Sequence, residues 1–275
     1  MATQTKQVVI ITGASSGMGK ATAKLLLNEG FIVYAAARRI DKMNDLKASG
    51  AKILKMDVTD DQSMVDGINQ VVREQGRIDV LFNNAGYGLF GAVENLSIDE
   101  ARRQFEVNLF GLGRLTQLVL PHMRKQKSGL IINNSSMGGK IYTPLGAWYH
   151  ATKHALEGFS DCLRLEVAQF GIKVVIVEPG NIETEWGGIM VDHVKKSSEN
   201  SSYSAYANAF VKLMGGFEGK GSSPDVIARV VLKAIRAKQP KTRYVAGAMA
   251  TPFLLMRKLL SDRIFDGMLR SMMKN

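Results

Sequence analysis

Cysteine is almost absent from this 275-residue chain, which has a single thiol at Cys162. One cysteine excludes an internal disulfide and is typical of proteins in a reducing compartment, so we expect a cytoplasmic protein. No apolar run approaches the ~20 residues that a helix needs to span a bilayer. Residues 1–6 lead directly into a strand-like run and leave no room for a signal peptide. These absences predict a soluble protein.

Proline and acidic residues are also scarce. The chain has 6 prolines and no linker rich in proline or glycine, so residues 1–275 are predicted to form a single dinucleotide-binding and catalytic domain. Acidic side chains number 25 against 36 lysines and arginines, a net charge of +11, of which +8 lies in Pro224–Asn275. Such a segment fits a nucleic acid, an anionic membrane or an anionic cofactor. No nucleic-acid motif accompanies it, so we predict no nucleic-acid partner and do not favour peripheral membrane contact.

Apolar runs of strand length alternate with amphipathic stretches of helical length. Most runs are continuous, as in strands that are covered on both faces of a sheet. This order predicts an α/β fold with a doubly wound, Rossmann-like parallel sheet. The expected strands are Gln7–Ile11, Phe31–Ala36, Lys52–Met56, Val80–Asn83, Leu130–Ser135, Val174–Glu178 and, with a weaker pattern, Arg243–Ala246. The expected helices are Met18–Asn28, Asp60–Glu74, Ile98–Lys125, Trp148–Phe170 and Asp225–Ala237.

A glycine-rich segment follows the first expected strand and opens the first expected helix. Glycines allow positive φ and a close approach of the main chain to a ligand. The peptide N–H groups at a helix start favour a pyrophosphate. On its own the pattern also fits a tight turn that binds nothing. As a dinucleotide site it would use Gly13, Ser15, Ser16, Gly17, Met18 and Gly19.

The residues that end the second expected strand indicate which dinucleotide binds. An acidic residue there would bind a ribose 2′-hydroxyl, but this chain has Ala37 followed by Arg38 and Arg39. Guanidinium groups match phosphate geometry and keep their charge. We therefore predict NADP(H), with Arg38 as the principal ligand of the 2′-phosphate and Arg39 as the second. Asp57, which precedes Val58, is predicted to bond the adenine amino group.

A phenol and an ammonium, Tyr149 and Lys153, stand four residues apart in an expected helix and share one face. A free tyrosine titrates near ~10, so acid–base work at neutral pH requires that the phenolate be favoured. A nearby ammonium and a cationic nicotinamide would both do so. Ser136 follows the strand Leu130–Ser135, and its hydroxyl is suited to polarise a substrate oxygen.

These residues make the chain resemble the short-chain dehydrogenase/reductase family over Gln7–Thr184. The family's Thr-Gly-x-x-x-Gly-x-Gly motif is matched by Thr12–Gly19, and its Asn-Asn-Ala-Gly motif by Asn83–Gly86. Its Pro-Gly turn is matched by Pro179-Gly180. The glycine spacing differs from the Gly-x-x-Gly-x-x-Gly of the family's sugar-nucleotide epimerases.

The resemblance implies four catalytic residues. Tyr149 would donate a proton to the substrate carbonyl, or accept it in reverse, and Lys153 would lower the Tyr149 pKa and contact the nicotinamide ribose. Ser136 would orient the substrate, and Asn108 would hold a water that links Lys153 to solvent. Many relatives are dimers or tetramers, which implies a homodimer or homotetramer. The further implied cofactor contacts are Val58, Asn84, Ala85, Gly86, Tyr149, Lys153, Pro179, Gly180, Ile182 and Thr184.

Some residues near these motifs are given no catalytic role. Glu178 stands where many members of the family have Asn, and we expect it to alter the nicotinamide pocket. His150, His154 and Trp148 are predicted to pack or line a pocket, and Cys162 to pack in its helix. No further cluster of His, Cys, Asp or Glu has metal-ligand spacing, so no metal is predicted.

The favoured function is an NADP(H)-dependent oxidoreductase that reduces a small carbonyl compound or oxidises a secondary alcohol. The alternative is a non-catalytic NADP(H)-binding, redox-sensing regulator. Such regulators commonly lose the tyrosine or lysine that this chain retains. Apolar pocket candidates favour a ketone of the steroid, retinoid or fatty-acyl type; they are Tyr87, Leu89, Phe90, Tyr142, Leu145, Trp186 and Met190.

Two segments are predicted to border the substrate. Residues 184–223 are rich in glycine and serine and follow a central strand, which predicts a mobile lid. Within this lid, Tyr203, Tyr206, Phe210 and Leu213 have the spacing of a short helix.

Residues 252–275 predict an amphipathic C-terminal helix. This helix would pack on its own domain, on a second subunit or on a membrane, and packing on protein is favoured. Its expected apolar stripe is Leu260, Ile264, Met268 and Met272, with Phe265 and Leu269 beside it, and its polar side is Asp262, Arg263, Asp266, Arg270 and Lys274.

Overall fold

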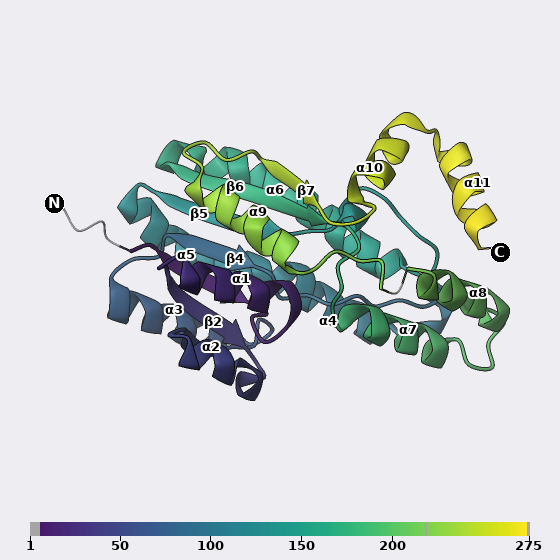
Figure 1. Cartoon of the computed structure of the whole chain (residues 1–275), viewed down its shortest axis with the longest axis horizontal. Coiled ribbons are helices and arrows are strands. Elements are labelled where there is room, and N and C mark those ends of the chain that lie inside the picture. Colours follow the sequence, from purple (N-terminus) through teal and green to yellow (C-terminus); the bar gives the residue numbers. More distant parts are fainter. Residues whose placement is uncertain (1–5, 218, 274–275) are drawn as a thin grey trace.

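Seven strands form one sheet in the order β3-β2-β1-β4-β5-β6-β7 (Figure 1). The computed structural model describes residues 6–217 and 219–273. Every neighbouring pair of strands is parallel, which confirms the predicted doubly wound sheet. The strands are β1 (Val8–Thr12), β2 (Ile32–Ala37), β3 (Lys52–Lys55), β4 (Val80–Asn83), β5 (Gly129–Asn134), β6 (Ile172–Pro179) and β7 (Arg243–Ala246).

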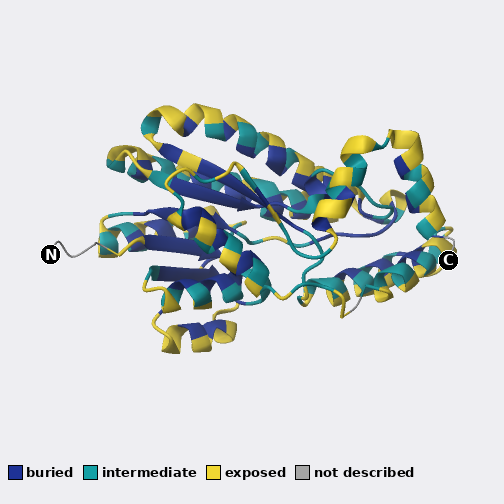
Figure 2. Cartoon of the chain, turned by 45° about the horizontal axis from the view of Figure 1, so that its top comes forward, coloured by how far each residue is buried: buried dark blue, intermediate teal, exposed yellow. Residues whose placement is uncertain are grey.

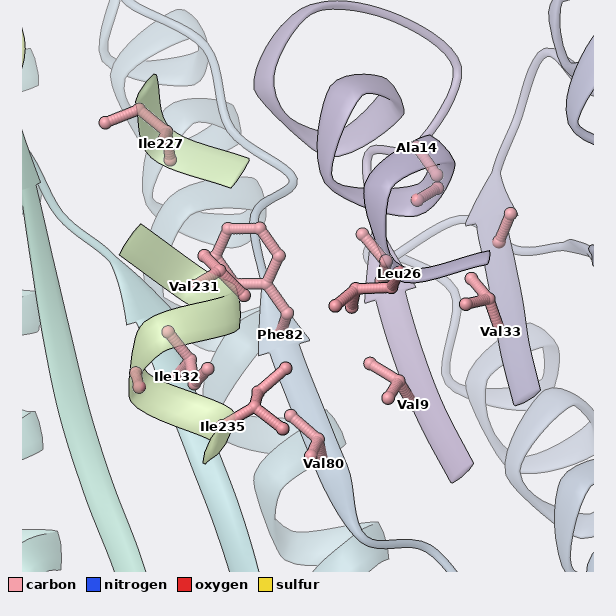
Figure 3. Packing of buried hydrophobic residues seen from close by; sticks show 14 of the residues in the cluster. Val9, Ala14, Leu26, Val33, Val80, Phe82, Ile132, Ile227, Val231 and Ile235 are labelled. Atoms are coloured by element: carbon pink, nitrogen blue, oxygen red, sulfur yellow. The ribbon is translucent and has the colours of Figure 1, made fainter. Parts of the chain in front are cut away.

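Helices cover both faces of the sheet and bury its central strands (Figure 2). On one face, Leu26 of α1 and Val231 of α9 pack over Val9 and Phe82 of the sheet (Figure 3). The continuous apolar runs of the sequence arise because each central strand is covered on both sides. The helices on this face are α1 (Gly17–Asn28), α2 (Asn44–Ala48) and α9 (Asp225–Arg236), and those on the other are α3 (Asp61–Gln75), α5 (Gly111–Gln126) and α6 (Ala147–Val167).

The predicted helix Ile98–Lys125 is interrupted. Between α4 (Ile98–Phe105) and α5 lies a π-helical segment, η3 (Glu106–Phe110), with Asn108 at its centre. π-Helical turns occur mainly as short insertions at functional sites, and this one carries Asn108 inward, where it is 1% exposed. Gly111 follows, and a Cβ there would lie 2.2 Å from the carbonyl oxygen of Val58. The helix backbone therefore packs directly on the loop after β3.

The segment 184–223 contains two helices rather than one. The predicted helix around Phe210 is α8 (Ser204–Gly215). The sequence did not predict the second helix, α7 (Trp186–Ser197). Its last residues begin a polar run, which is typical of a loop. Met190 and Val194 are the buried residues of α7. The two helices lie beside each other beyond the carboxyl ends of the strands (Figure 1).

The C-terminal region also forms two helices, α10 (Ala250–Leu259) and α11 (Asp262–Met272), so the prediction of one continuous helix is wrong. Leu260 and Ser261 are both extended, which ends α10 and places Ser261 at the N-cap position of α11 without a side-chain capping hydrogen bond. The buried residues of α11 are Phe265 and Leu269, whereas Ile264, predicted for the apolar stripe, is 59% exposed. Lys274 lies outside the described residues. The two helices project from the body of the molecule (Figure 1).

Candidate active site

The glycine segment turns from β1 into α1 at the carboxyl edge of the sheet. Gly13 and Gly17 adopt the left-handed conformation, with φ of 66° and 52°. Ser16 precedes α1 but its side chain makes no capping hydrogen bond, so it leaves the N–H groups of the first turn without an acceptor. Thr184 reaches the segment from beyond β6, because its Cγ2 lies 3.1 Å from the place of a Cβ on Gly17. A glycine turn with free N–H groups at a helix start is suited to bind an anion such as a pyrophosphate.

A chain of hydrogen bonds joins this turn to α6. Thr12 Oγ1 accepts from the backbone N–H groups of Asn84 and Ala85 at 2.9 and 3.0 Å. Asn84 Oδ1 accepts from Asn134 Nδ2 at 3.0 Å. The carbonyl oxygen of Asn134 in turn accepts from Lys153 Nζ at 2.8 Å. The ends of β1, β4 and β5 are thereby fixed relative to Lys153.

Two arginines lie at the end of β2. Arg38 and Arg39 are largely exposed, and each makes one long ion pair, with Asp57 at 4.0 Å and with Glu185 at 3.9 Å. The strand itself ends at the buried Ala37. Because these ion pairs are long and exposed, they are weak, and the guanidinium groups keep donors for an anion.

Ser136 and Tyr149 meet at the carboxyl end of β5. Ser136 follows the strand and precedes η4 (Met137–Gly139), and its Oγ accepts from the N–H of Gly138 at 3.0 Å. Tyr149 lies in the first turn of α6, and its hydroxyl interacts with the Ser136 side chain, which favours the phenolate. The structure therefore brings these two predicted residues together.

Asn108 connects η3 to the same site. Its Oδ1 accepts from the N–H of Tyr87, while its Nδ2 donates to the carbonyl oxygen of Tyr87 and to Thr152 Oγ1, over 2.9–3.1 Å. A Cβ on Gly86 would lie 3.2 Å from Asn108 Oδ1 and 3.9 Å from Lys153 Nζ. The Asn108 amide is thus engaged with protein groups and holds the loop after β4 beside Lys153.

Burial dominates the electrostatics of the site. Tyr149 is 9% exposed, and its ring lies 5.4 Å from that of Phe90 and 5.5 Å from that of Trp186. Burial raises the pKa of Tyr149 to about 12, and the hydrogen bond to Ser136 opposes the rise. Burial also lowers the pKa of Lys153 to about 8. In the protein alone, burial against aromatic rings therefore outweighs any lowering of the Tyr149 pKa, and the lowering by Lys153 and a bound cationic nicotinamide stays a prediction.

Tyr142 connects the C-terminal helices to the site. Tyr142, after η4, donates its hydroxyl to Asp266 of α11 at 2.9 Å, and the guanidinium of Arg257 lies over its ring. This contact ties α10 and α11 to the segment that follows Ser136.

Apolar side chains from several elements surround Tyr149. The cluster contains Phe90, Met190, Val194, Ala207, Phe210 and Met273, with Leu145 and Trp186 partly buried against it.

The Pro-Gly turn leads β6 toward α7. A Cβ on Gly180 would lie 2.1 Å from the carbonyl oxygen of Ala248, so only glycine fits there. Ile182 pairs with Ser222 and packs against the core on the α1 face. Pro179, Gly180 and Ile182 are therefore fixed at the carboxyl edge between β6 and Thr184.

His150 and Cys162 were both expected to have packing roles. His150 is buried and its ring bonds the carbonyl oxygen of Gly138 and the N–H of Thr143, which confirms a packing role. Burial lowers the pKa of His150 to about 4, so it is neutral. Cys162 is exposed, and its predicted packing role is wrong.

Glu178 is the residue whose environment the sequence did not indicate. Its side chain is buried with Glu157 of α6 and Arg243 of β7. It therefore belongs to a buried charge cluster, and its effect on the nicotinamide pocket stays a prediction.

Within residues 6–217 and 219–273, no three His, Cys, Asp or Glu side chains gather in a metal-binding arrangement. Across the same residues, no helix has the length and apolar character to cross a membrane.

Comparison with known proteins decides the family. Residues 7–193 match the family described as short chain dehydrogenase. The chain belongs to this short-chain dehydrogenase family. It is 36% identical to a 3-ketodihydrosphingosine reductase of Bacteroides thetaiotaomicron, over 96% of this chain and 97% of the relative.

Solved structures agree with this assignment. A short-chain dehydrogenase from Streptomyces avermitilis is 32% identical with a TM-score of 0.80, over 98% of this chain and 96% of its own. A metagenomic short-chain oxidoreductase in complex with NADP is 28% identical with a TM-score of 0.68, over 87% and 96%. The chain is thus an oxidoreductase that acts on CH–OH or C=O groups of small molecules with a nicotinamide cofactor. A cytoplasmic location and a homodimer or homotetramer remain predictions.

Proposed function

We propose that this short-chain dehydrogenase uses NADP(H) to reduce an apolar ketone, or to oxidise the corresponding secondary alcohol. The observation that carries the proposal is the meeting of Ser136, Tyr149 and Lys153 beside an apolar cluster that includes Phe90 and Trp186. The likeness to a 3-ketodihydrosphingosine reductase supports a long-chain keto compound among the steroid, retinoid and fatty-acyl types.

The described residues fit the cofactor. The left-handed glycines and uncapped start of α1 suit its pyrophosphate, and Thr184 and the Pro179-Gly180 turn would hold its nicotinamide end. Arg38 and Arg39 suit a 2′-phosphate, because β2 ends without an acidic residue to bind a ribose 2′-hydroxyl. The NADP complex of the metagenomic relative supports the same choice.

In the mechanism, the bound cofactor supplies or accepts the hydride. Ser136 Oγ donates a hydrogen bond to the substrate carbonyl and polarises it. Tyr149 then donates its phenolic proton to the same oxygen, so the phenol O–H bond breaks as the alcohol O–H forms. The raised pKa of Tyr149 keeps this proton in place until substrate arrives. The Lys153 ammonium, close by on the same face of α6, stabilises the phenolate that results.

The surrounding side chains hold the Tyr87 loop in place and keep water away from the Tyr149 phenol. Asn108 fixes the Tyr87 loop beside Lys153, and because its amide is engaged, a water held there would bond to the backbone of η3. Phe90 and Trp186 exclude water from the phenol. We also propose that α7 and α8 act as the lid of this site.

A redox-sensing regulator without activity is not favoured, because all four catalytic side chains are present. A panel of ketones and alcohols, assayed with NADPH and NADP+ by absorbance at 340 nm, tests the function. We expect turnover of long-chain ketones above that of small polar ones. No turnover across the panel, with NADPH binding intact, would favour the regulator.

The cofactor choice gives a separate prediction. Arg38→Ala is expected to weaken NADPH binding by about 1–3 kcal/mol, the loss of a charge-assisted hydrogen bond, with little effect on NADH. Titration of cofactor fluorescence measures both affinities. Arg102→Ala, at an exposed arginine paired with Asp99 on α4, is the matched control and should change neither. Equal affinities of the unaltered protein for NADPH and NADH would rule out the 2′-phosphate site.

A further inference from the structure

Two carboxyl groups are buried on the α6 side of the sheet. Glu157 lies on α6, one helical turn beyond Lys153, and is 3% exposed. Glu178 lies near the end of β6 and is 2% exposed. Carboxyl groups are rarely buried to this extent unless they are paired, because removing their charge from water is costly.

The pair has cationic neighbours on two other elements. Glu157 Oε2 lies 3.1 Å from Lys140 Nζ, just after η4, and 3.1 Å from the Arg243 guanidinium of β7. Arg243 Nε also lies 3.3 Å from Glu178 Oε1. The same guanidinium bonds Asp161 of α6 at 2.6 Å. Asp161 also pairs with Arg164 on its own helix. The charge of Arg243 is therefore divided among three carboxyl groups.

A shared proton accounts for the closeness of the two glutamates. The Oε1 atoms of Glu157 and Glu178 lack hydrogen-bond partners among the described residues, and both carboxyl groups lie within 3.3 Å of the same Arg243 guanidinium. Two carboxyl oxygens attract only when one carries a proton. Burial, and the charge of Glu157, raise the pKa of Glu178 to about 7, which assigns the proton to this group near neutral pH.

The pair adjoins the catalytic residues. A Cβ on Gly139 of η4 would lie 2.9 Å from Glu157 Cγ, 2.7 Å from Ser135 Oγ and 3.1 Å from the carbonyl oxygen of Lys153. Glu157 therefore packs against the segment that follows Ser136 and against the turn of α6 that carries Lys153. Positions i and i+4 on a helix are neighbours, so the Glu157 carboxylate also attracts the Lys153 ammonium.

We propose that Glu157 and Glu178 are positioning residues, a buried carboxyl pair that holds one proton and whose remaining negative charge keeps Lys153 as an ammonium. The inference rests on the proposed role of Lys153. Below neutral pH the pair carries one negative charge, and above it a second one develops as the shared proton leaves. The charged groups that face the pair are Lys140 after η4, Lys153, Asp161 and Arg164 on α6, and Arg243 on β7.

The sign of the effect follows from the environment of Lys153. Burial disfavours its ammonium and Glu157 favours it, so removing the Glu157 charge lowers the Lys153 pKa further. Glu157→Gln is expected to lower it by about one pH unit. From a pKa of about 8, this is about a threefold loss of ammonium at pH 7.5. The basic limb of the kcat/KM profile then moves to lower pH.

Lysine labelled with ¹³C at Cε gives a direct readout by NMR, in which the Lys153 signal is identified by its loss in Lys153→Arg. Glu157→Gln should shift the titration of that signal to lower pH. Glu178→Gln should shift it less, because Glu157 keeps its charge. Asp79→Asn is the matched control. Asp79 is also buried and paired with arginine, but it directly precedes β4 and so lies at the amino ends of the strands, away from the site; its replacement should not shift the Lys153 titration.

A Lys153 titration in Glu157→Gln that matches Asp79→Asn would overturn the proposal and leave the pair as packing alone. If Glu157→Gln does not fold, Glu178→Gln carries the test, and an unchanged Lys153 titration in it overturns the proposal. The NMR titration needs no turnover. Failure of the proposed reaction is therefore seen only in the substrate panel, and failure of this inference in the titration.

Discussion

Replacing Tyr149 by phenylalanine is expected to lower kcat for ketone reduction by about a thousandfold, within the range that general acid catalysis contributes. The hydroxyl is the only group removed, and the ring keeps its contacts with Phe90 and Trp186. The dissociation constant for NADPH should stay nearly unchanged, because the phenol is proposed to act on the substrate. Stopped-flow or steady-state absorbance at 340 nm measures kcat, and cofactor fluorescence measures binding.

Two comparisons make this result specific. Tyr244→Phe removes a hydroxyl from β7 that accepts only the N–H of Lys241 among the contacts described, and it should keep full activity. Lys153→Ala should lower both kcat and NADPH affinity, because the ammonium is expected to serve the phenol and the ribose. Retention of most activity by Tyr149→Phe would show that another group is the acid.

The sheet was predictable because its strands are covered on both faces. Val9, Ile10 and Ile11 are each fully buried, and a run of this kind admits few alternatives to a central parallel strand. The site residues at the carboxyl ends were predictable for a related reason. Adjacent parallel strands end at one edge, so residues that follow β1, β4 and β5 must meet there.

Other features depend on three-dimensional contacts that a periodic pattern does not carry. The η3 insertion leaves the apolar spacing of the surrounding helices almost unchanged, so it was not visible around Asn108. The α7 helix is held by the buried Met190 and Val194 and ends in a polar stretch that begins at Lys195. The environment of Glu178 depends on Glu157 and Arg243, which are distant in sequence.

Ending the chain before Thr251, which removes nearly all of α10 and α11, is expected to raise KM for long-chain ketones by at least about tenfold. Phe265 and Leu269 cover Ile141 and pack with Tyr142, and Met273 joins the cluster around Tyr149. We expect the same helices to cover the bound substrate, and loss of one buried apolar contact with it costs about 1.5–3 kcal/mol, which is tenfold or more in affinity. Binding of NADPH should be retained, because Ala250, the residue of α10 that packs against Gly180, is kept in the shortened chain.

Point variants on α11 distinguish the loss of its packing contacts from a general loss of stability. Leu269→Ala removes a buried side chain and should raise KM in the same direction as the truncation, whereas Ile264→Ala changes an exposed one and should leave KM unchanged. Binding of a hydrophobic dye should increase in the truncated protein, because the apolar residues around Ile141 become exposed. Light scattering shows whether the oligomer changes as well, as it would if the helices packed on a second subunit. Unaltered mass, dye binding, stability and kinetics after truncation would mean that these helices are dispensable to the site.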